Sequence, residues 1–332
     1  MNKFLILGSN SVSAGYLIKL LLTNKNNKLI GFSRNKQYLQ TLTPFNKNNK
    51  SSLNFQFHKI DIKKDYLKAF KIIDKFAPNY VINYAAQGEV RNSWNYPLDW
   101  YETNIISTIR IIEFLKNKKY IKKYISVSTP EVYGSSLKKI TENGFFNPST
   151  PYAISKLSSD LHLKAIYRQY KFPVVFTRSA NIYGPHQQFY RIIPKTIINL
   201  NLGKKIILHG KGLTQRSFIH ASDAANFTLN VIKKGKSGEV YHCSTNEKPI
   251  SIKELVKIIC IKMNKNFNES VTLNKDNFGQ DQCYFLNSIK AKQKLNWYPK
   301  FKLSEGIDST IEWIKKDWST IKKQELNYIH QK

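Results

Sequence analysis

The feature that most constrains the fold is a regular alternation of two apolar patterns along the first 180 residues. Short runs rich in β-branched and aromatic residues alternate with longer segments whose apolar residues recur at helical spacing. Strands that alternate with helices predict an α/β fold, a Rossmann-like, doubly wound parallel sheet. The predicted strands are Phe4–Leu7, Leu29–Phe32, Phe55–Ile60, Tyr80–Asn83, Tyr124–Ser128 and Val174–Arg178, and the predicted helices are Ala14–Leu22, Tyr66–Phe76, Thr103–Asn117 and Pro151–Tyr170.

The second half of the chain is less regular, and at 332 residues the chain is longer than one average domain. We predict a first domain over residues 1–180 and a smaller, discontinuous C-terminal α/β lobe over 181–320, with segments around 215–245 returning to the first domain. The lobe depends on the sheet for burial of its segments. Its predicted elements are a strand at Lys205–Leu208 and helices at Ile192–Leu202, Ser222–Lys233, Ile252–Met263 and Leu303–Ile314.

The formal net charge of +31 raises the question of a nucleic-acid partner. The lysines are spread over predicted helix faces and loops, without an arginine stripe or a nucleic-acid-binding motif, so we predict no nucleic-acid partner. A basic field would instead attract an anionic substrate.

Metal and disulfide sites are also not indicated. Cys243, Cys260 and Cys283 lack C-x-x-C spacing and are predicted to be buried small hydrophobes, and the histidines show no metal-binding spacing. The apolar run at the N-terminus is too short for a signal peptide, and no apolar stretch reaches 18 residues, so we expect no membrane partner and a cytoplasmic location.

The turn after the first predicted strand occupies the position of a G-x-x-G-x-x-G dinucleotide-binding loop. Gly8 matches the first glycine, Ser11 and Ala14 stand at the second and third positions, and Gly15 comes one place late. Small residues there permit close approach of a pyrophosphate to the backbone and to a helix N-terminus. The turn is either such a site or an ordinary tight turn.

Polar residues follow the second and third strands. Ser33 and Arg34 stand where an acidic residue would bind a ribose 2′-hydroxyl, and a hydroxyl with a guanidinium suits a 2′-phosphate. We therefore favour NADP over NAD, the alternative being an exposed loop arginine. Asp61 is either a partner of the adenine or a helix N-cap.

The fourth strand closes on small residues, Ala85 and Ala86, before Gln87, which would let a cofactor lie flat against the backbone. Asn104 lies within a predicted helix, where asparagine is a poor helix former. Its presence indicates either a hydrogen-bonding role or a bent or water-filled helix.

The stretch Ser126–Lys156 carries the residue types that acid–base chemistry needs. Thr129 and Glu131 follow the fifth strand, at the edge of the sheet where α/β proteins bind ligands. Tyr152 and Lys156 are four residues apart and share one helix face, so an ammonium would favour the phenolate and lower the tyrosine pKa toward working pH. Glu131 could alternatively do no more than stabilise the strand end.

Together and in order, these motifs resemble an extended short-chain dehydrogenase/reductase of the NAD-dependent epimerase/dehydratase family, over essentially the whole chain. The segment Thr129–Gly134 is most similar to the T-D-E and T-S-E segments of nucleotide-sugar 4,6-dehydratases, and Thr177–Pro185 and Gln215–His220 resemble the nucleotide-sugar lobe of that group. The resemblance implies a nucleotide-diphosphate sugar substrate, a tightly bound nicotinamide cofactor, and a homodimer through the helices at 103–117 and 151–170.

The implied reaction is redox-neutral. Tyr152, supported by Thr129 and Lys156, would take the O4 proton as hydride leaves C4; Glu131 would then remove the C5 proton, water would leave from C6, and hydride would return to C6. The resemblance implies cofactor contacts from Gly8, Ser11, Ala14, Ser33, Arg34, Asp61, Ile62, Ala85, Ala86, Gln87, Asn104, Tyr152, Lys156 and Ser179, and substrate contacts from Asn181, Arg191, Arg216 and Asp281.

The departure from the family pattern is Pro130. In dTDP-glucose 4,6-dehydratases this position is an aspartic acid that protonates the departing C6 hydroxyl, and proline has no proton to give. GDP-mannose 4,6-dehydratases have a serine there and are thought to use the glutamate as both base and acid. Two alternatives to a dehydratase stay open: a 4-epimerase or 4-ketoreductase of the same fold, and a non-catalytic NAD(P)-binding regulatory protein.

Overall fold

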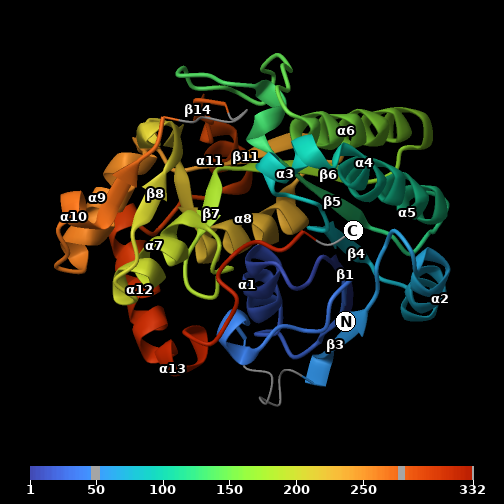
Figure 1. Cartoon of the computed structure of the whole chain (residues 1–332). Helices are drawn as coiled ribbons and strands as arrows, with labels where there is room; N and C mark the ends of the chain where they lie inside the picture. The colour runs from blue at the N-terminus through green and yellow to red at the C-terminus, as the bar shows by residue number, and fades with distance from the viewer. Residues whose placement is uncertain (46–52, 276–280, 331–332) are drawn as a thin grey trace.

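The computed structural model describes residues 1–45, 53–275 and 281–330, and its centre is a seven-stranded parallel sheet (Figure 1). The strand order is β11-β6-β5-β4-β1-β2-β3, so the direction of winding reverses between β1 and β4. This arrangement confirms the predicted doubly wound fold. The strands are β1 (Asn2–Leu7), β2 (Asn27–Ser33), β3 (Phe55–Lys59), β4 (Tyr80–Asn83), β5 (Lys123–Ser128), β6 (Val174–Ser179) and β11 (Val240–Cys243).

Helices cover both faces of this sheet, which is why its central strands are continuous apolar runs. On one face α1 (Val12–Leu21), α8 (Ala221–Lys234) and α11 (Ile289–Leu295) share a core with residues of the sheet. On the other, α2 (Tyr66–Phe76), α5 (Ser107–Leu115) and α6 (Pro151–Tyr170) do the same. The sequence therefore located most of these elements to within a few residues.

The helix predicted at 103–117 begins earlier than expected and is not regular. After α3 (Val90–Asn95), the chain forms α4 (Pro97–Tyr101), one π-helical turn η3 (Glu102–Ile106) and then α5. Asn104 lies in the π turn, where its side chain bonds to backbone groups of Gln87. The asparagine that disfavours a regular helix thus marks both a helix irregularity and a hydrogen-bonding role.

The remaining elements form a separate core of the smaller lobe and three small sheets, in which β7 pairs β10, β9 lies between β12 and β14, and β8 pairs β13. The domain boundaries stay a prediction, although α8 and β11, from the predicted returning segment, pack on or in the large sheet. The elements are β7 (Asn181–Tyr183), α7 (Ile192–Asn201), β8 (Ile206–Leu208), η5 (His209–Gly212), β9 (Gln215–Arg216), β10 (Phe218–His220), β12 (Ile250–Ser251), α9 (Ile252–Lys262), α10 (Phe267–Ser270), β13 (Val271–Leu273), β14 (Cys283–Tyr284), α12 (Leu303–Lys316) and α13 (Trp318–Ile321).

Three smaller outcomes bear on the sequence interpretation. Cys243, Cys260 and Cys283 are buried and free, as predicted. Across the described ranges, no helix has the length and apolar character needed to cross a bilayer. The stretch 46–50, whose lysine and asparagine content suggests a solvated loop, lies outside the described residues.

Candidate active site

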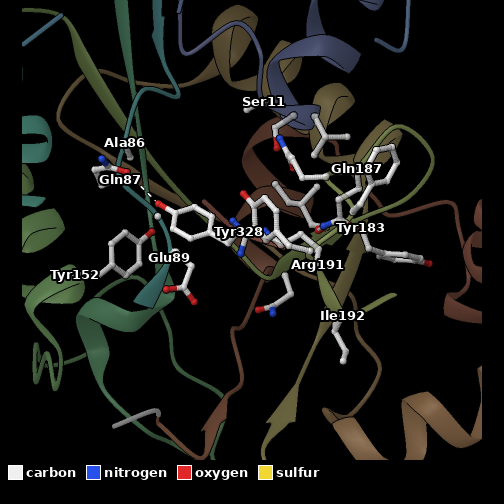
Figure 2. Close-up of a pocket in the computed structure, with 18 of the residues that line it drawn as sticks. Ser11, Ala86, Gln87, Glu89, Tyr152, Tyr183, Gln187, Arg191, Ile192 and Tyr328 are labelled. Carbon is white, nitrogen blue, oxygen red and sulfur yellow. Dashed lines mark hydrogen bonds between the residues drawn. The ribbon is translucent and has the colours of Figure 1, made fainter. Parts of the chain in front are cut away.

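A cavity of about 1330 Å³ lies at the carboxyl ends of the central strands and extends to the smaller lobe (Figure 2). Its volume exceeds the roughly 300–1,000 Å³ typical of a site for one small ligand. Residues from the turn after β1, the ends of β2, β4 and β5, and α6 line one part, and residues around β7, α7 and β9 line the other. The cavity therefore has room for a dinucleotide and a second ligand.

The turn between β1 and α1 is shaped for close backbone approach. Gly8 has φ +76°, and a Cβ added to it would lie 2.6 Å from the backbone nitrogen of Ala85. Ser11 caps α1 by accepting a hydrogen bond from the Ala14 nitrogen at 3.3 Å, and Ser11 also lines the cavity. The helix N-terminus therefore opens onto the cavity, which fits a pyrophosphate. Ala14 is fully buried and lies behind this surface.

Residues at the ends of β2 and β3 line the same part of the cavity. The Ser33 hydroxyl accepts a hydrogen bond from the Asn10 nitrogen at 3.0 Å, and Arg34 and Ile62 also line the cavity. Asp61 lines it too, and its carboxylate accepts a hydrogen bond from the Lys63 nitrogen at 2.9 Å. The helix N-cap interpretation of Asp61 was wrong, because α2 begins five residues later with Asp65 at its N-cap position, and Asp61 caps the turn before it.

The end of β4 is fixed from behind by Asn104. This side chain is 1% exposed, accepts a hydrogen bond from the Gln87 nitrogen at 2.9 Å, and donates to the Gln87 carbonyl at 3.1 Å and to Ser155 Oγ at 2.9 Å. Ala85, Ala86 and Gln87 line the cavity. Asn104 therefore positions cavity-lining backbone instead of facing the cavity itself.

The stretch after β5 is a short 3₁₀ turn, η4 (Pro130–Tyr133). Thr129 is its N-cap and accepts a hydrogen bond from the Glu131 nitrogen at 3.3 Å. Pro130 occupies the first position of the turn, where the missing N–H is not needed. Thr129 and Glu131 consequently reach the cavity within one turn of the strand end.

Helix α6 brings Tyr152 and Lys156 to the same place. Thr150 caps this helix by accepting a hydrogen bond from the Ala153 nitrogen at 3.1 Å, so Tyr152 lies in its first turn. Both predicted acid–base residues line the cavity, and Lys156 Nζ donates to the Val127 carbonyl at 2.8 Å. The predicted grouping of Thr129, Glu131, Tyr152 and Lys156 around one cavity is what the structure has.

One electrostatic expectation was wrong. Burial, and next the charge of Glu131, raise the pKa of Tyr152 above its ordinary value. A hydrogen bond with Thr129 and the charge of Arg191 act in the lowering direction, whereas the Lys156 ammonium is directed to a backbone carbonyl. Burial also lowers the pKa of Lys156. In the protein alone, Tyr152 is therefore a neutral phenol.

Glu131 has the site's most unusual environment. Its Oε2 atom is buried and has no hydrogen-bond partner in the described part of the chain. Burial raises the pKa of Glu131 to about 7, opposed by the charge of Arg216 and reinforced by that of Asp281. This carboxyl group can therefore both take and give a proton near neutral pH.

The lobe side of the cavity carries the predicted substrate residues. Asn181 lines it, as does Arg191, which precedes α7 and lies over the ring of Tyr190. Ser179, predicted as a cofactor contact, also lines the cavity. Arg216 also lines it, but its guanidinium donates to the carbonyls of Gln215 at 2.8 Å and Asp281 at 2.9 Å.

Asp281 is placed differently from the prediction. It is outside the cavity lining, and its carboxylate accepts hydrogen bonds from Ser149 at 2.8 Å and Tyr284 at 2.7 Å. The Tyr284 ring in turn lies under the Arg216 guanidinium, at 4.4 Å. In this structure Asp281 supports Arg216 and Tyr284 behind the cavity wall.

Sequence reasoning missed two cavity residues that lie far apart in the chain. Tyr190 precedes Arg191, and Tyr328 lies after the last helix, yet their rings meet edge to face with centroids 5.2 Å apart. Neither belongs to a recognisable motif. The side-by-side position of Tyr190 and Tyr328 depends on the path of the chain after α13.

The strand order, the glycine turn at a helix N-terminus and the Tyr152/Lys156 pair at one cavity define an extended short-chain dehydrogenase/reductase. The sequence model described as GDP-mannose 4,6 dehydratase matches residues 5–310. The chain belongs to this family of nucleotide-sugar 4,6-dehydratases, and is thus an enzyme.

Individual relatives agree with this assignment. The chain is 36% identical over 252 residues to the dTDP-D-glucose 4,6-dehydratase of Homo sapiens, which covers 73% of this chain and 71% of the human protein. It is 31% identical over 280 residues to the dTDP-glucose 4,6-dehydratase of Haemophilus influenzae, covering 78% of this chain and 82% of that protein.

A solved structure with bound cofactor has the same fold. The dTDP-glucose 4,6-dehydratase from Bacillus anthracis in complex with NAD superposes with a TM-score of 0.84 at 29% identity, covering 96% of this chain and 98% of that chain.

Proposed function

We propose that this protein converts a nucleotide-diphosphate hexose to the 4-keto-6-deoxy sugar, and that Glu131 is both the base and the acid of the elimination. The observation that carries the proposal is the buried, unpartnered Oε2 of Glu131 beside Tyr152 in one cavity. A group that must accept a proton from carbon and return it to oxygen needs a pKa near the working pH, and that of Glu131 is raised to about 7.

The first step is oxidation at C4. Tyr152, in its phenolate form, takes the proton of the O4 hydroxyl and becomes the neutral phenol, and the Thr129 hydroxyl hydrogen-bonds the phenolate before the transfer, an interaction that acts to lower the phenol pKa. Lys156 lies one helical turn from Tyr152. With a cofactor bound, its ammonium would hold the ribose and place a positive charge beside the phenol, which would favour the phenolate. A nicotinamide cofactor, when bound, supplies the hydride acceptor and later the hydride donor.

The second step is loss of water. The C4 ketone acidifies the C5 hydrogen, and Glu131 removes it. Because Pro130 cannot donate a proton, the protonated Glu131 gives that same proton to the C6 hydroxyl, which leaves as water. The Glu131 carboxylate is thereby regenerated with no net proton uptake. When hydride adds to C6, the proton that Tyr152 took from O4 is given back to the resulting enolate and ends on C5, so the C4 ketone remains and the Tyr152 phenolate is restored.

We propose NAD as the cofactor, held by the Gly8 turn, the N-terminus of α1 and the ends of β2 to β6. The bacterial relative described above carries NAD, and this supports NAD over the NADP that Arg34 suggested. The sugar nucleotide would take the lobe side, with its diphosphate near Asn181, Arg191 and Arg216, three polar groups that line this side.

We further propose a homodimer through η3 and α6. Ile106, Ile154 and Leu161 lie on these elements and are 41–49% exposed, an apolar surface that a partner helix pair would cover. The three free, buried cysteines fit a reducing compartment such as the cytoplasm. Light scattering of the eluting protein would test the dimer.

Product analysis tests the function. We expect the purified protein, incubated with dTDP-glucose, GDP-mannose and UDP-glucose in parallel, to release a 4-keto-6-deoxy product from at least one of them without net cofactor oxidation or reduction. Tyr152→Phe should lower this turnover by roughly 10²–10⁴-fold, since it removes one general acid–base group. Recovery of a folded, fully active Tyr152→Phe protein would remove Tyr152 from the mechanism.

A 4-epimerase is the second candidate, and Pro130 is the observation that favours it, because an epimerase needs no acid at C6. In that case Tyr152 and Lys156 act and Glu131 is incidental. A 4-epimer as the sole product, with turnover unaffected by Glu131→Gln, would establish the epimerase and overturn the dehydratase.

A further inference from the structure

The described chain ends with a segment that lies along the active-site cavity. After α13 the residues up to 330 form no further helix or strand, and the chain runs back from the lobe to the sheet (red in Figure 1). Glu325, Asn327, Tyr328 and Ile329 all line the cavity. A segment remote in sequence from every motif of the site is thus part of its wall.

Both ends of this segment are anchored, on different parts of the molecule. Leu326 packs against the core of the smaller lobe. His330 Nε2 lies 2.8 Å from Asp99 Oδ2, and its ring stacks on Tyr96 and Trp100 with centroids 4.5 and 5.4 Å apart. The segment therefore spans from the lobe to α3 and α4 beside the sheet.

Tyr328 lies between the two anchors and points into the cavity (Figure 2). Its hydroxyl donates a long hydrogen bond of 3.5 Å to Gln87 Oε1, at the end of β4. Its ring meets Tyr190, beside the substrate residue Arg191, edge to face. One side chain therefore touches both the cofactor side and the lobe side of the cavity.

We propose that residues 325–330 form a strap over the dinucleotide, anchored by Leu326 and His330, in which Tyr328 contacts the bound cofactor and slows its exchange. The purpose of the strap rests on the proposed function: because hydride returns to the sugar in every cycle, the cofactor never needs to leave. Tyr328 lines the same cavity as the Gly8 turn and the ends of β2 and β4, where the dinucleotide is proposed to bind.

Dissociation of the cofactor tests the strap directly and needs no sugar nucleotide. Protein loaded with radiolabelled NAD is mixed with excess unlabelled NAD, and the loss of label gives the dissociation rate. We expect this rate to rise by about 10- to 100-fold in His330→Ala, which loses a hydrogen bond to a carboxylate and two stacked rings, and in a chain that ends at Leu326.

The matched control is Tyr298→Ala, since Tyr298 is a half-exposed tyrosine outside the cavity lining, and its dissociation rate should equal that of the unmodified protein. With saturating NAD added, His330→Ala should keep its turnover within about threefold, because His330 contacts no reacting group. Activity that depends on added NAD in the variants and not in the unmodified protein would agree with the strap.

The outcomes separate the two proposals. Unchanged dissociation rates in His330→Ala and in the shortened chain would overturn the strap and leave the dehydratase proposal standing. Slower dissociation or tighter binding in the shortened chain would identify the segment as an inhibitory plug, which also overturns the strap. Faster dissociation together with only a 4-epimer as product would keep the strap and overturn the dehydratase.

Discussion

Two carboxylates close to the end of β5 have opposite surroundings. Asp160 accepts hydrogen bonds from the Arg178 guanidinium at 2.9 Å and from Ser128, the last residue of β5, at 2.7 Å. Glu131, three residues beyond Ser128, forms no ion pair within the described residues. The same functional group is thus neutralised by a cation in one place and left without one in the other.

The Asp160 cluster is one chain of charge-assisted and neutral hydrogen bonds. Arg178 also donates to the Tyr133 hydroxyl, which lies 2.8 Å from His242 Nε2. His242 Nδ1 must donate to the Asn287 carbonyl, so its Nε2 accepts from Tyr133. Burial lowers the pKa of His242 to about 3, consistent with this neutral tautomer. The cluster ties α6, β6, η4 and β11 together.

The cation nearest in effect to Glu131, Arg216, makes its hydrogen bonds with other groups. Arg216 directs its guanidinium to backbone carbonyls and lies over the ring of Tyr284, so it affects Glu131 only through its field. The comparison shows that the role of such a carboxylate depends on whether a cation pairs with it. Asp160 stabilises the join between elements, and Glu131 is left with a pKa suited to proton transfer.

The largest expected effect concerns the proposed catalytic role of Glu131. Glu131→Gln should lower formation of the 4-keto-6-deoxy product by roughly 10²–10⁴-fold, because the amide can neither take nor return the C5 proton. C4 oxidation does not need Glu131, so reduced cofactor should accumulate and be visible in its absorbance. A variant that dehydrates normally would assign the elimination to another group.

The stabilising role of the Asp160–Arg178 ion pair is tested by removing the Arg178 cation. Arg178→Met leaves Asp160 as an unpaired buried charge and should lower the free energy of unfolding by about 3–5 kcal/mol, measured in urea. The control is the double variant Arg178→Met/Asp160→Leu, which removes both charges and should recover most of the loss. A single variant as stable as the unmodified protein would show that the ion pair contributes nothing.

A pH series tests the Glu131 side of the comparison, because Glu131 is expected to titrate near neutral pH. Its folded-state pKa of about 7 lies above the ordinary 4.5, so the protonated form favours the folded state. The resulting stability is present below the unfolded-state pKa and is lost as the pH rises to about 7, a total of about 3 kcal/mol. Urea unfolding of the unmodified protein should show this loss, and Glu131→Gln should lack it. Equal pH dependence in both proteins would contradict the raised pKa.

The sequence predicted this site better where its determinants are local. Helix α6 runs from Pro151 to Tyr170 as predicted, because a cap, a first-turn proline and helical spacing all lie within the segment. Tyr152 and Lys156 followed from that helix. The pKa of Tyr152 was mispredicted because it depends on burial and on Glu131, which only the fold brings near.

Residues whose position depends on distant contacts could not be predicted. Asp281 was expected to face the substrate, but Ser149, 132 residues away in sequence, and Tyr284 take its carboxylate. Tyr328 reaches the cavity only because the segment after α13 crosses back to the sheet. Neither the contacts of Asp281 nor the position of Tyr328 produces a periodic pattern or a motif in the sequence.

The smallest expected effect concerns Pro130, which lies in η4 between Thr129 and Glu131. Pro130→Asp would place an acid where the dTDP-glucose enzymes have one, but if Glu131 already performs both transfers the gain in turnover should stay well below the roughly 10²-fold that supplying a missing acid would bring. The second carboxyl group should raise the pKa of Glu131 further, so the pH–rate profile should move to higher pH. The pH–rate profiles of the unmodified protein and of Pro130→Asp test this expectation. A rise in turnover of roughly 10²-fold or more would mean that Glu131 alone is an inadequate acid and acts only as the base.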